Sequence, residues 1–450
     1  MKDSNLNIRM DSFINRQFSQ ISTGGYPVLL HKMFSLVLFL CKTPLYSLAV
    51  LLVMMIRLFS PIVVIRLGML DLCRIGAMTN ADWYLSQKED GLHLGRYLDF
   101  FYFVKSTNHV NGQWLKMWRR SMPTLPGTQL WKSVQWLNRI FPGYKNYETP
   151  DITVYPTQKT WKPNQIDPKS KMIYKNNVLL NAVLKNRSPN ITFTVHEEEK
   201  GVRALDNLGI LKGKQYICFH ARDSAYLDSV LTTKDWSYHD YRDSSIENYL
   251  LAAKKMANRG YYVVRMGSVV KKSIPISHLR IIDYATNGQR TDFNDIYIGG
   301  HCRFFLCSDG GMAAIPECFR RPVIYTNWTR MNGLITATTI VTGLVIFKKF
   351  FLKNENRYMH FSETLDLKFG GEDTNEIFHQ LGLELIENTP EEIQAVTMEM
   401  DERLNGTWQT TKEDEKLQQR FWDLFGPDKL KSPDLRIGTK YLRENQELLN

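Results

Sequence analysis

The stretch Tyr216-Ile-Cys-Phe-His-Ala-Arg-Asp223 decides the fold that we predict, because an apolar run in it passes directly into charged residues. A short apolar run of this kind is typical of a strand that is buried on both faces of a sheet. A helical pattern follows, which we predict to begin with the capping box Ser244-Ser-Ile-Glu247 and to end at Gly260. This order of strand and helix predicts the start of a parallel α/β sheet.

The same alternation continues along the chain. We predict further strands at Tyr261–Met266, Arg280–Asp283, Arg303–Cys307 and Pro322–Tyr325. Between the last two, Ser308-Asp-Gly-Gly311 opens a helix that ends near Phe319. Such a pattern indicates a parallel sheet with helices on both faces, and ligands of these sheets bind at the carboxyl ends of the strands.

Size and charge limit the function classes. The chain has 450 residues, which allows two or three domains, and a formal net charge of +11, which favours anionic partners. Nucleic acid is the least favoured partner, since the basic residues are spread along the chain and no helix-turn-helix or zinc-finger signature is present. The six cysteines form no CxxC pair, which fits a reducing compartment and gives no metal site.

An apolar segment, Met33–Ile56, lies near the amino terminus and is interrupted by Lys42 and Pro44. It either spans a membrane, lies in the membrane interface or forms a buried pair of helices. A central lysine costs about 2.5–3.5 kcal/mol on insertion, so we favour the interfacial, monotopic alternative. We expect the polar residues Met1–Tyr26 before it to form a loose lead-in.

A second, less regular α/β pattern precedes the first. It predicts strands at Ser60–Arg66 and Tyr97–Val104 and helices at Asn80–Gln87, Gln113–Arg120 and Leu130–Ile140. Further helices begin at the caps Thr194 and Thr389. We therefore predict four parts: a polar lead-in with an apolar membrane-associated segment at residues 1–57, two α/β domains at 58–195 and 196–404, and a helical extension at 405–450.

The loops that follow the strands predict an anion site. The turn Ser308-Asp309-Gly310-Gly311 leaves backbone N–H groups at the start of a helix, where a phosphate can approach closely. Arg222 directly follows a buried strand, so its guanidinium can bind a diphosphate with two hydrogen bonds, and Asp223 could hold it in place.

Other side chains support the site less specifically. Arg265 ends the next strand and could also bind a diphosphate. His220 is either part of the ligand site or a core histidine, and Glu317 either accepts both hydroxyls of a ribose or is solvated. Lys348 and Lys349 either face a phosphate or lie exposed. No Walker lysine motif and no GxGxxG is present, which disfavours ATPases and dehydrogenases.

Several motifs together resemble one family. They are His220-Ala-Arg-Asp223, Asn248-Tyr249, Gly260–Gly267, Ile282-Asp-Tyr284, Asp292–Asp295 and Phe319-Arg-Arg-Pro322. They resemble bacterial surface-polysaccharide glycosyltransferases of GT-B type, and the HxRD loop is similar to that of α1,6-fucosyltransferase-like enzymes. The resemblance implies two Rossmann-like domains. The amino-terminal one, residues 58–195, would be the acceptor-side domain, and the carboxy-terminal one, residues 196–404, would bind the nucleotide sugar. Residue by residue, it implies that the donor is bound by Arg222, Arg265, Asp309, Gly310 and Gly311. Three residues after the last strand also resemble the family's pattern: Lys348, Lys349 and Glu363.

The chain departs from the family in one loop, where relatives often read Ile-Gly-His and this sequence reads Ile75-Gly76-Ala77. Asp71 is therefore our candidate for the catalytic base that takes the proton of the acceptor hydroxyl. Because no DxD motif is suitably placed, we expect no metal and no cofactor beyond the nucleotide sugar as co-substrate.

The leading hypothesis is a glycosyltransferase that acts on a lipid-linked glycan in bacterial surface polysaccharide, for example lipopolysaccharide, synthesis. It would be peripheral or monotopic at the cytoplasmic face of the inner membrane, and would bind no nucleic acid. Two alternatives stay open: an inactive membrane-associated scaffold that binds nucleotide or glycan, and a sugar-nucleotide epimerase of similar fold.

Overall fold

The computed structural model describes residues 2–70, 75–89, 95–103, 111–149, 187–230, 235–331, 333–336, 342–367, 369, 371, 373–426 and 434–449, without the side chains of 2–18, 35–41, 77, 80, 83, 87, 335 and 336. The chain forms two compact units. The first consists of Met1–Gly68, Arg96–Tyr102 and Leu125–Pro150, and the second of Met69–Gly95, Phe103–Thr124 and Asp151–Asn450.

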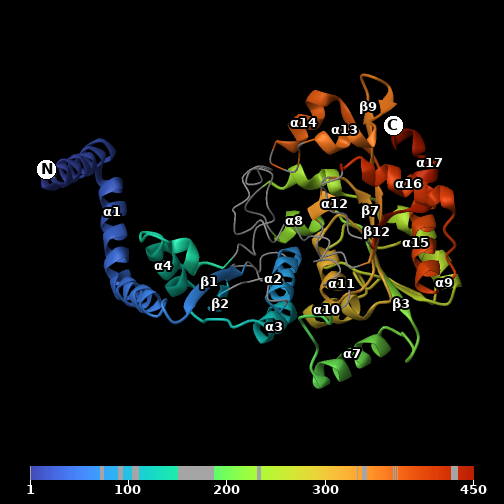
Figure 1. The fold of residues 1–450 in the computed structure, drawn as a ribbon, viewed down its shortest axis with the longest axis horizontal. Coiled ribbons are helices and arrows are strands. Elements are labelled where there is room, and N and C mark those ends of the chain that lie inside the picture. The colour runs from blue at the N-terminus through green and yellow to red at the C-terminus, as the bar shows by residue number, and fades with distance from the viewer. Residues whose placement is uncertain are drawn as a thin grey trace. The chain divides into compact units, whose positions relative to one another are not determined.

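The second unit is built on a seven-stranded sheet in which every pair of neighbouring strands is parallel (Figure 1). The strand order is β12-β8-β7-β6-β3-β4-β5. The strands are β3 (Tyr216–His220), β4 (Tyr262–Arg265), β5 (Ile281–Ile282), β6 (Phe305–Ser308), β7 (Val323–Trp328), β8 (Gly343–Phe347) and β12 (Leu435–Ile437). The α/β class that the sequence predicts is confirmed.

Helices cover both faces of this sheet, as the unbroken apolar strands require. On one side lie α9 (Leu250–Asn258) and α15 (Pro390–Leu404), and on the other α10 (Asp292–His301) and α11 (Ala314–Cys318) (Figure 1). Capping boxes at Thr194 and Thr389 start α7 (Val195–Asn207) and α15, as predicted. The predicted box at Ser244–Glu247 is wrong: a 3₁₀ turn, η4 (Ile246–Tyr249), forms there, and the Glu247 carboxylate binds Lys272 instead.

A small antiparallel sheet that we did not predict follows β8. It consists of β9 (Lys349–Leu352), β10 (Arg357–Tyr358) and β11 (Leu383–Ile386), with α13 (Phe361–Asp366) and α14 (Thr374–Leu381) beside it. Its core contains Phe350, Phe369 and Phe378, against which the ring of Tyr241 packs. Tyr241 belongs to the 3₁₀ turn η3 (Ser237–Arg242), so this core anchors η3.

Two helices of the predicted acceptor-side domain belong to the second unit. They are α2 (Thr79–Glu89) and α3 (Gly112–Ser121). Asp82 of α2 forms a buried ion pair with Arg320 after α11, at 2.6 Å, and Arg120 of α3 pairs with Glu197 at 2.9 Å. These pairs explain why the observed division does not follow the boundary predicted near residue 195.

The carboxy-terminal residues also belong to the second unit rather than to a separate extension. They form α16 (Lys412–Asp423), α17 (Thr439–Glu444) and the short turn η6 (Gln446–Leu449), and β12 completes one edge of the sheet. Phe421 and Tyr441 lie in the same apolar core as the sheet. The remaining elements of this unit are η1 (Ile75–Met78), α8 (Ala225–Val230), η5 (Gly311–Ala313) and α12 (Gly333–Thr336).

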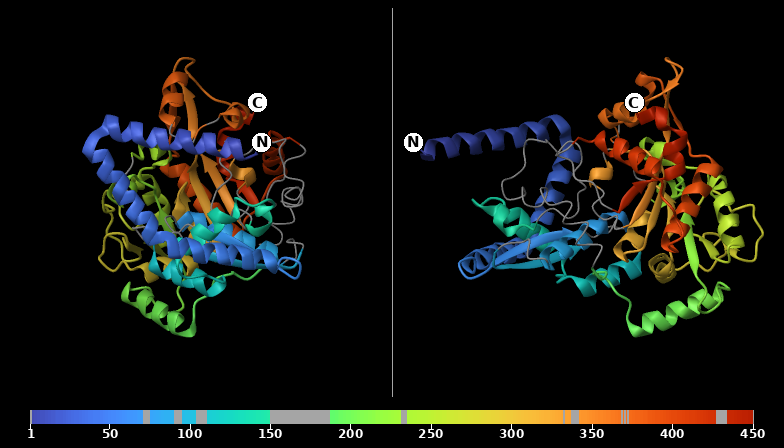
Figure 2. Two further views of the ribbon diagram at one scale, coloured as in Figure 1. Left: turned by 90° about the vertical axis from the view of Figure 1, so that its left-hand side faces the viewer. Right: turned by 45° about the vertical axis from the view of Figure 1, so that its right-hand side comes forward.

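The first unit begins with α1 (Lys2–Leu58), which bends at Gly25 (Figure 2). Gly25 has a φ of 63° and a ψ of −157°, a backbone conformation that favours glycine. The expectation of a loose lead-in before Tyr26 is wrong, because no glycine or proline before Gly24 ends the helix.

The rest of the first unit packs against the second half of α1. It contains α4 (Thr128–Asn138), η2 (Tyr144–Tyr147) and a two-stranded sheet of β1 (Val64–Leu70) and β2 (Tyr97–Phe103). Val53 of α1 and Val134 of α4 are buried in a common core. In the described residues this unit has only these two strands. A second Rossmann-like domain, which the resemblance implies, would have a larger sheet.

Candidate functional site

The strand order places a topological switch point between β3 and β6. From β3 the chain proceeds to β4 and β5 on one side, whereas β6, β7 and β8 follow on the other. Ligands of open α/β sheets bind outside the carboxyl ends of the strands at such a point. The two loops that leave β3 and β6 are joined there, because the backbone N–H of Arg222 donates to Ser308 Oγ at 2.8 Å.

Arg222 lies at this switch point, and only part of its guanidinium is hydrogen-bonded. Its Nη1 donates to the carbonyl oxygen of His239 at 3.1 Å and to the carboxylate of Asp243. Its Nη2 is buried and has no partner among the residues that the structure describes. Burial and the neighbouring charge of Arg242 lower the pKa of Arg222 to about 10, so an additional anion would stabilise its charged form.

Asp309 lies beside Arg222 and faces three arginines. Its Oδ1 is 3.5 Å from Arg330 Nη2 and 4.0 Å from Arg242 Nη1, and its Oδ2 has no partner in the described part of the chain. Burial raises the pKa of Asp309, but the charges of Arg330, Arg242 and Arg222 outweigh burial and lower it. The carboxylate is therefore ionised at neutral pH. Arg242 and Arg330 lie near Asp309, and Arg222 pairs with Asp243, so the cluster contains three arginines and two carboxylates.

Lys348 follows β8 and reaches the same region, but not an open surface. Only 5% of the residue is exposed, and its Nζ donates to the carbonyl oxygens of Tyr241 at 3.1 Å and Asp243 at 2.5 Å. Burial lowers the pKa of this lysine, although the charge of Glu387 opposes the effect. Lys348 therefore holds the backbone of η3 and Asp243.

His220, at the carboxyl end of β3, is positioned by the loop after β4. Its Nδ1 lies 3.0 Å from the carbonyl oxygen of Met266, and burial lowers its pKa. A neutral ring must donate from Nδ1, since a carbonyl only accepts, so Nε2 carries a lone pair.

Two predicted donor ligands instead stabilise the neighbouring loops. Arg265 is 2% exposed, and its Nη1 donates to Lys272 O at 2.7 Å and to Asp283 Oδ2 at 3.2 Å. The carboxylate of Asp223 accepts from the backbone N–H groups of Ala225 and Lys271, each at 3.0 Å. The expectation that Asp223 holds Arg222 is therefore wrong, because Asp243 takes that place.

Three further predicted residues have partners outside the Arg222 cluster. Glu317 is 8% exposed and accepts from the hydroxyl of Tyr325. Lys349 Nζ lies 3.0 Å from Glu392 Oε1. Glu363 accepts hydrogen bonds from Arg357 at 2.7 and 2.8 Å and from the N–H of His360. The hydrogen bonds from Arg357 are the main cause that lowers the pKa of Glu363 to about 2. The structure does not bring these three side chains to Arg222.

The glycine turn after β6 differs from the predicted helix start. Gly311 begins the 3₁₀ turn η5, and the following helix, α11, has only five residues. Pro316 in α11 lacks a backbone N–H, which limits regular helix before it. Gly310 has a φ of −161°, which any residue adopts.

The turn after β6 lies in close contact with a second loop through glycines on both sides. A Cβ at Gly76 of η1 would lie 3.2 Å from the Cα of Gly311, so the two turns touch backbone to backbone. The Ile75-Gly76-Ala77 loop thus borders the switch point. Asp71, the predicted base, lies outside the described residues, and its role stays a prediction.

Three charged residues of the site were missed in the sequence: Arg242, Asp243 and Arg330. Arg330 follows β7 as Arg222 follows β3, so the rule that found one could have found the other. Arg242 and Asp243 carry no such signal, because anchoring of Tyr241 in the small sheet's core brings them to the site.

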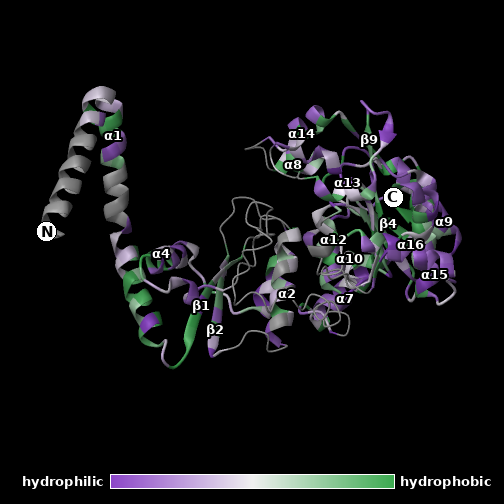
Figure 3. Ribbon diagram, turned by 45° about the horizontal axis from the view of Figure 1, so that its top comes forward, coloured by the Kyte–Doolittle hydropathy of each residue, from purple (hydrophilic) through white to green (hydrophobic). Residues whose placement is uncertain are grey.

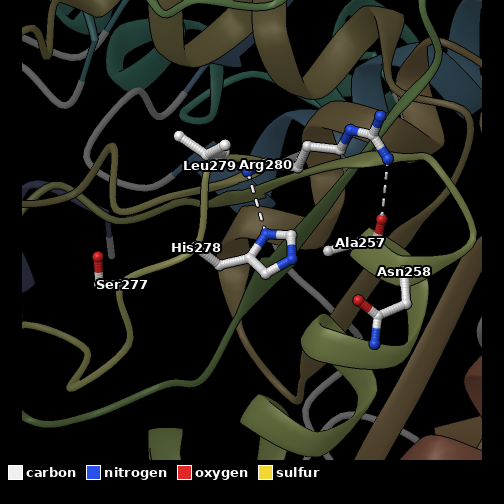
Figure 4. A pocket seen from close by; sticks show the side chains of 6 residues that line it. All are labelled: Ala257, Asn258, Ser277, His278, Leu279 and Arg280. Carbon is white, nitrogen blue, oxygen red and sulfur yellow. Dashed lines mark hydrogen bonds between the residues drawn. The ribbon is translucent and has the colours of Figure 1, made fainter.

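A cavity of about 530 Å³ lies elsewhere, at the amino ends of β4 and β5 (Figure 4). Its lining residues are Ala257, Asn258, Ser277, His278, Leu279 and Arg280. Their hydrogen bonds join loop residues to one another: Arg280 N–H donates to His278 Nδ1 at 3.1 Å, and Arg280 Nη1 to Ala257 O at 3.4 Å. Because the strands' carboxyl ends lie at the opposite edge, we assign this cavity no role in the site.

Comparison with known proteins gives distant structural likenesses only. No family model matches the chain, and no curated protein matches it. A glycosyl transferase family 9 protein from Veillonella parvula is 10% identical, with a TM-score of 0.33 over 58% of this chain and 79% of its own. E. coli ADP-heptose lps heptosyltransferase II is 11% identical, with a TM-score of 0.36 over 70% of this chain and 97% of its own. The α/β fold rests on the strand order itself, and neither likeness supplies an argument about activity.

Proposed function

We propose that the protein is a glycosyltransferase of GT-B type that transfers a sugar from a nucleotide-sugar donor to a glycan acceptor. One observation carries the proposal: Arg222 lies at the β3–β6 switch point, with a buried Nη2 that has no partner in the described residues, beside Arg242 and Arg330. A cluster of arginines at this place suits the diphosphate of a nucleotide sugar.

The chemistry needs stabilisation of a leaving group. The bond between C1 of the sugar and the diphosphate oxygen breaks, and the electron pair stays on the diphosphate. Arg222, supported by Arg242 and Arg330, stabilises that growing charge. The acceptor hydroxyl oxygen bonds to C1, and its proton passes to a base, for which Asp71 is the candidate from the sequence.

Release of nucleoside diphosphate tests this function. Purified protein is supplied with a panel of nucleotide sugars and lipid-linked or free glycan acceptors, and we expect release that depends on both substrates. Binding without release would favour the scaffold alternative. Interconversion of free nucleotide sugars without any acceptor would favour the epimerase alternative.

The second half of α1 supports a membrane-surface location for this reaction. Ala49, Val53 and Ile56 are buried, whereas a second set of apolar residues is exposed by 44–77%: Leu48, Leu51, Met54, Met55 and Leu58. Figure 3 shows the hydrophobic residues along this half of α1 in green. Among the described residues, no helix is both long and apolar enough to cross a bilayer. An exposed apolar face of this size is typical of an interaction site. With the net charge of +11, it supports our proposal of a monotopic protein at the cytoplasmic face that uses a lipid-linked acceptor.

The exposed face of α1 predicts a binding experiment. We expect the protein to sediment with anionic vesicles, and high salt to release it only partly, because salt screens the charges but not the apolar contact. The variant Leu51→Glu/Met54→Glu should bind at least tenfold more weakly. Leu211→Glu, at a residue of the second unit that is 58% exposed, serves as the control. Wild-type protein that stays in the supernatant at every salt concentration would contradict the membrane proposal.

The glycine turn predicts a second experiment. A Cβ at Gly310 would make ordinary contacts of 3.7–3.8 Å with Ser308 and Arg222, and the φ of −161° tolerates any residue. We therefore expect Gly310→Ala to fold normally, whereas the larger Gly310→Val should raise the donor KM several-fold by blocking the diphosphate beside Arg222. The acceptor KM and the circular dichroism spectrum should stay unchanged. An unchanged donor KM in both variants would show that the diphosphate does not approach this turn.

A further inference from the structure

We propose that Asp243 occupies, in the ligand-free protein, the place on Arg222 that a phosphate group of the donor takes, so that donor binding displaces this carboxylate. The inference rests on the proposed function, because it concerns the same anion site. It assigns Asp243 a specific part in that site: a built-in competitor that sets the affinity for diphosphates.

The contacts of Arg222 show that its guanidinium is already partly occupied. Nη1 is engaged by the Asp243 carboxylate and by the carbonyl oxygen of His239. The side chain of Arg222 is 8% exposed and that of Asp243 is 21% exposed. Asp243 is therefore the more solvent-accessible member of this ion pair, and its carboxylate can move into solvent when a ligand binds Arg222.

A carboxylate and a phosphate compete for this position for a simple reason. Both present two oxygens to the N–H groups of a guanidinium at a similar spacing. When both lie within a few ångströms of each other, their charges repel. A diphosphate that binds Nη1 and the unpartnered Nη2 together must therefore move the Asp243 side chain.

The backbone around Asp243 is held, so only the side chain has to move. Lys348 Nζ donates to the carbonyl oxygen of Asp243 at 2.5 Å, and the N–H of Ser244 donates to Arg222 O at 3.0 Å. The Tyr241 ring packs edge-on against Phe369, with centroids 5.4 Å apart. Lys348 is thus a positioning residue for this segment rather than a donor ligand.

Calorimetric titration with inorganic pyrophosphate tests the proposal. Asp243→Asn and Asp243→Ala remove the competing charge, and we expect both to bind pyrophosphate about tenfold more tightly than wild type. Arg222→Ala should bind at least tenfold more weakly. Asp240→Asn is the matched control: it removes the same charge from the same segment, at an exposed residue that neighbours Arg222 without a direct ion pair. We expect it to change the affinity by less than twofold.

The other outcomes separate this inference from the proposed function. Weaker binding in both Asp243 variants would overturn the inference, because Asp243 would then orient Arg222. An equal gain in pyrophosphate affinity in Asp240→Asn would also overturn the inference. The loss of one negative charge at a distance would then explain the effect without displacement of a carboxylate. Unchanged pyrophosphate affinity in the Asp243 variants, together with weaker binding by Arg222→Ala, would overturn the inference. The proposed anion site at Arg222 would still stand. If neither wild type nor any variant binds pyrophosphate, the anion site itself is absent and both proposals fail.

Discussion

Replacing Arg222 by alanine is expected to lower kcat/KM for the donor by about 10²–10³-fold, the loss that follows removal of one preorganised donor of the charge-stabilising site. The guanidinium would contact the group that becomes more negative as the glycosidic bond breaks, so kcat should fall as well as donor affinity. The fold should survive, because the partner that is left behind, Asp243, is 21% exposed and can be hydrated. Initial rates over a range of donor concentrations measure the effect.

Two controls accompany this measurement. Arg222→Lys keeps the charge but loses the planar pair of N–H groups, and we expect an intermediate activity. Arg203→Ala, at an exposed position of α7, should leave the rate unchanged. Near-normal turnover in Arg222→Ala would remove this residue from the site.

Replacing Asp82 by alanine is expected to destabilise the second unit by about 3–5 kcal/mol, because it breaks a buried ion pair from one side. Asp82 is 1% exposed, accepts from Arg320 at 2.6 and 3.1 Å, and also binds Asn190 Nδ2 at 2.8 Å. The change leaves the charge of Arg320 buried without its carboxylate. Urea denaturation followed by circular dichroism measures the free energy of unfolding.

The double variant Asp82→Ala/Arg320→Ala distinguishes the cause. It leaves no uncompensated charge, so we expect it to be more stable than Asp82→Ala alone. If the double variant loses stability by the sum of the two single effects, Asp82 and Arg320 do not interact, and α2 is held by other contacts.

The regular part of the fold could be predicted from the sequence. The strands contain continuous apolar runs, such as Tyr216–Phe219 of β3 and Val323–Tyr325 of β7. Thr194 and Thr389 are followed at the third position by the glutamates that complete their caps. The small sheet of β9, β10 and β11 was not predictable in this way, because its short strands have only partly buried faces and no strict alternation.

The site residues could be predicted only where their place at the end of a strand determines their position in the fold. Arg222 and Ser308 lie at strand ends, so parallel pairing brings them together. The partners of Arg222 come from η3, which is placed by the packing of Tyr241 against rings that lie more than 120 residues further along the chain. Local sequence cannot reveal such a contact. Arg265 shows the converse: its position at the end of β4 fits an anion site, but Asp283 after β5 binds it instead.

The place of β12 in the sheet affects how the protein is made. Its partner β8 ends at Phe347, and β12 begins only at Leu435, so 87 residues separate the two paired strands. At a translation rate of roughly 5–20 residues per second, the outer edge of β8 stays unpaired for roughly 4–17 s on the ribosome. An open edge of this kind readily pairs with a strand of another chain. The yield of native protein should therefore depend on translation speed and on chaperones that cover the nascent sheet, as well as on the stability of the finished fold.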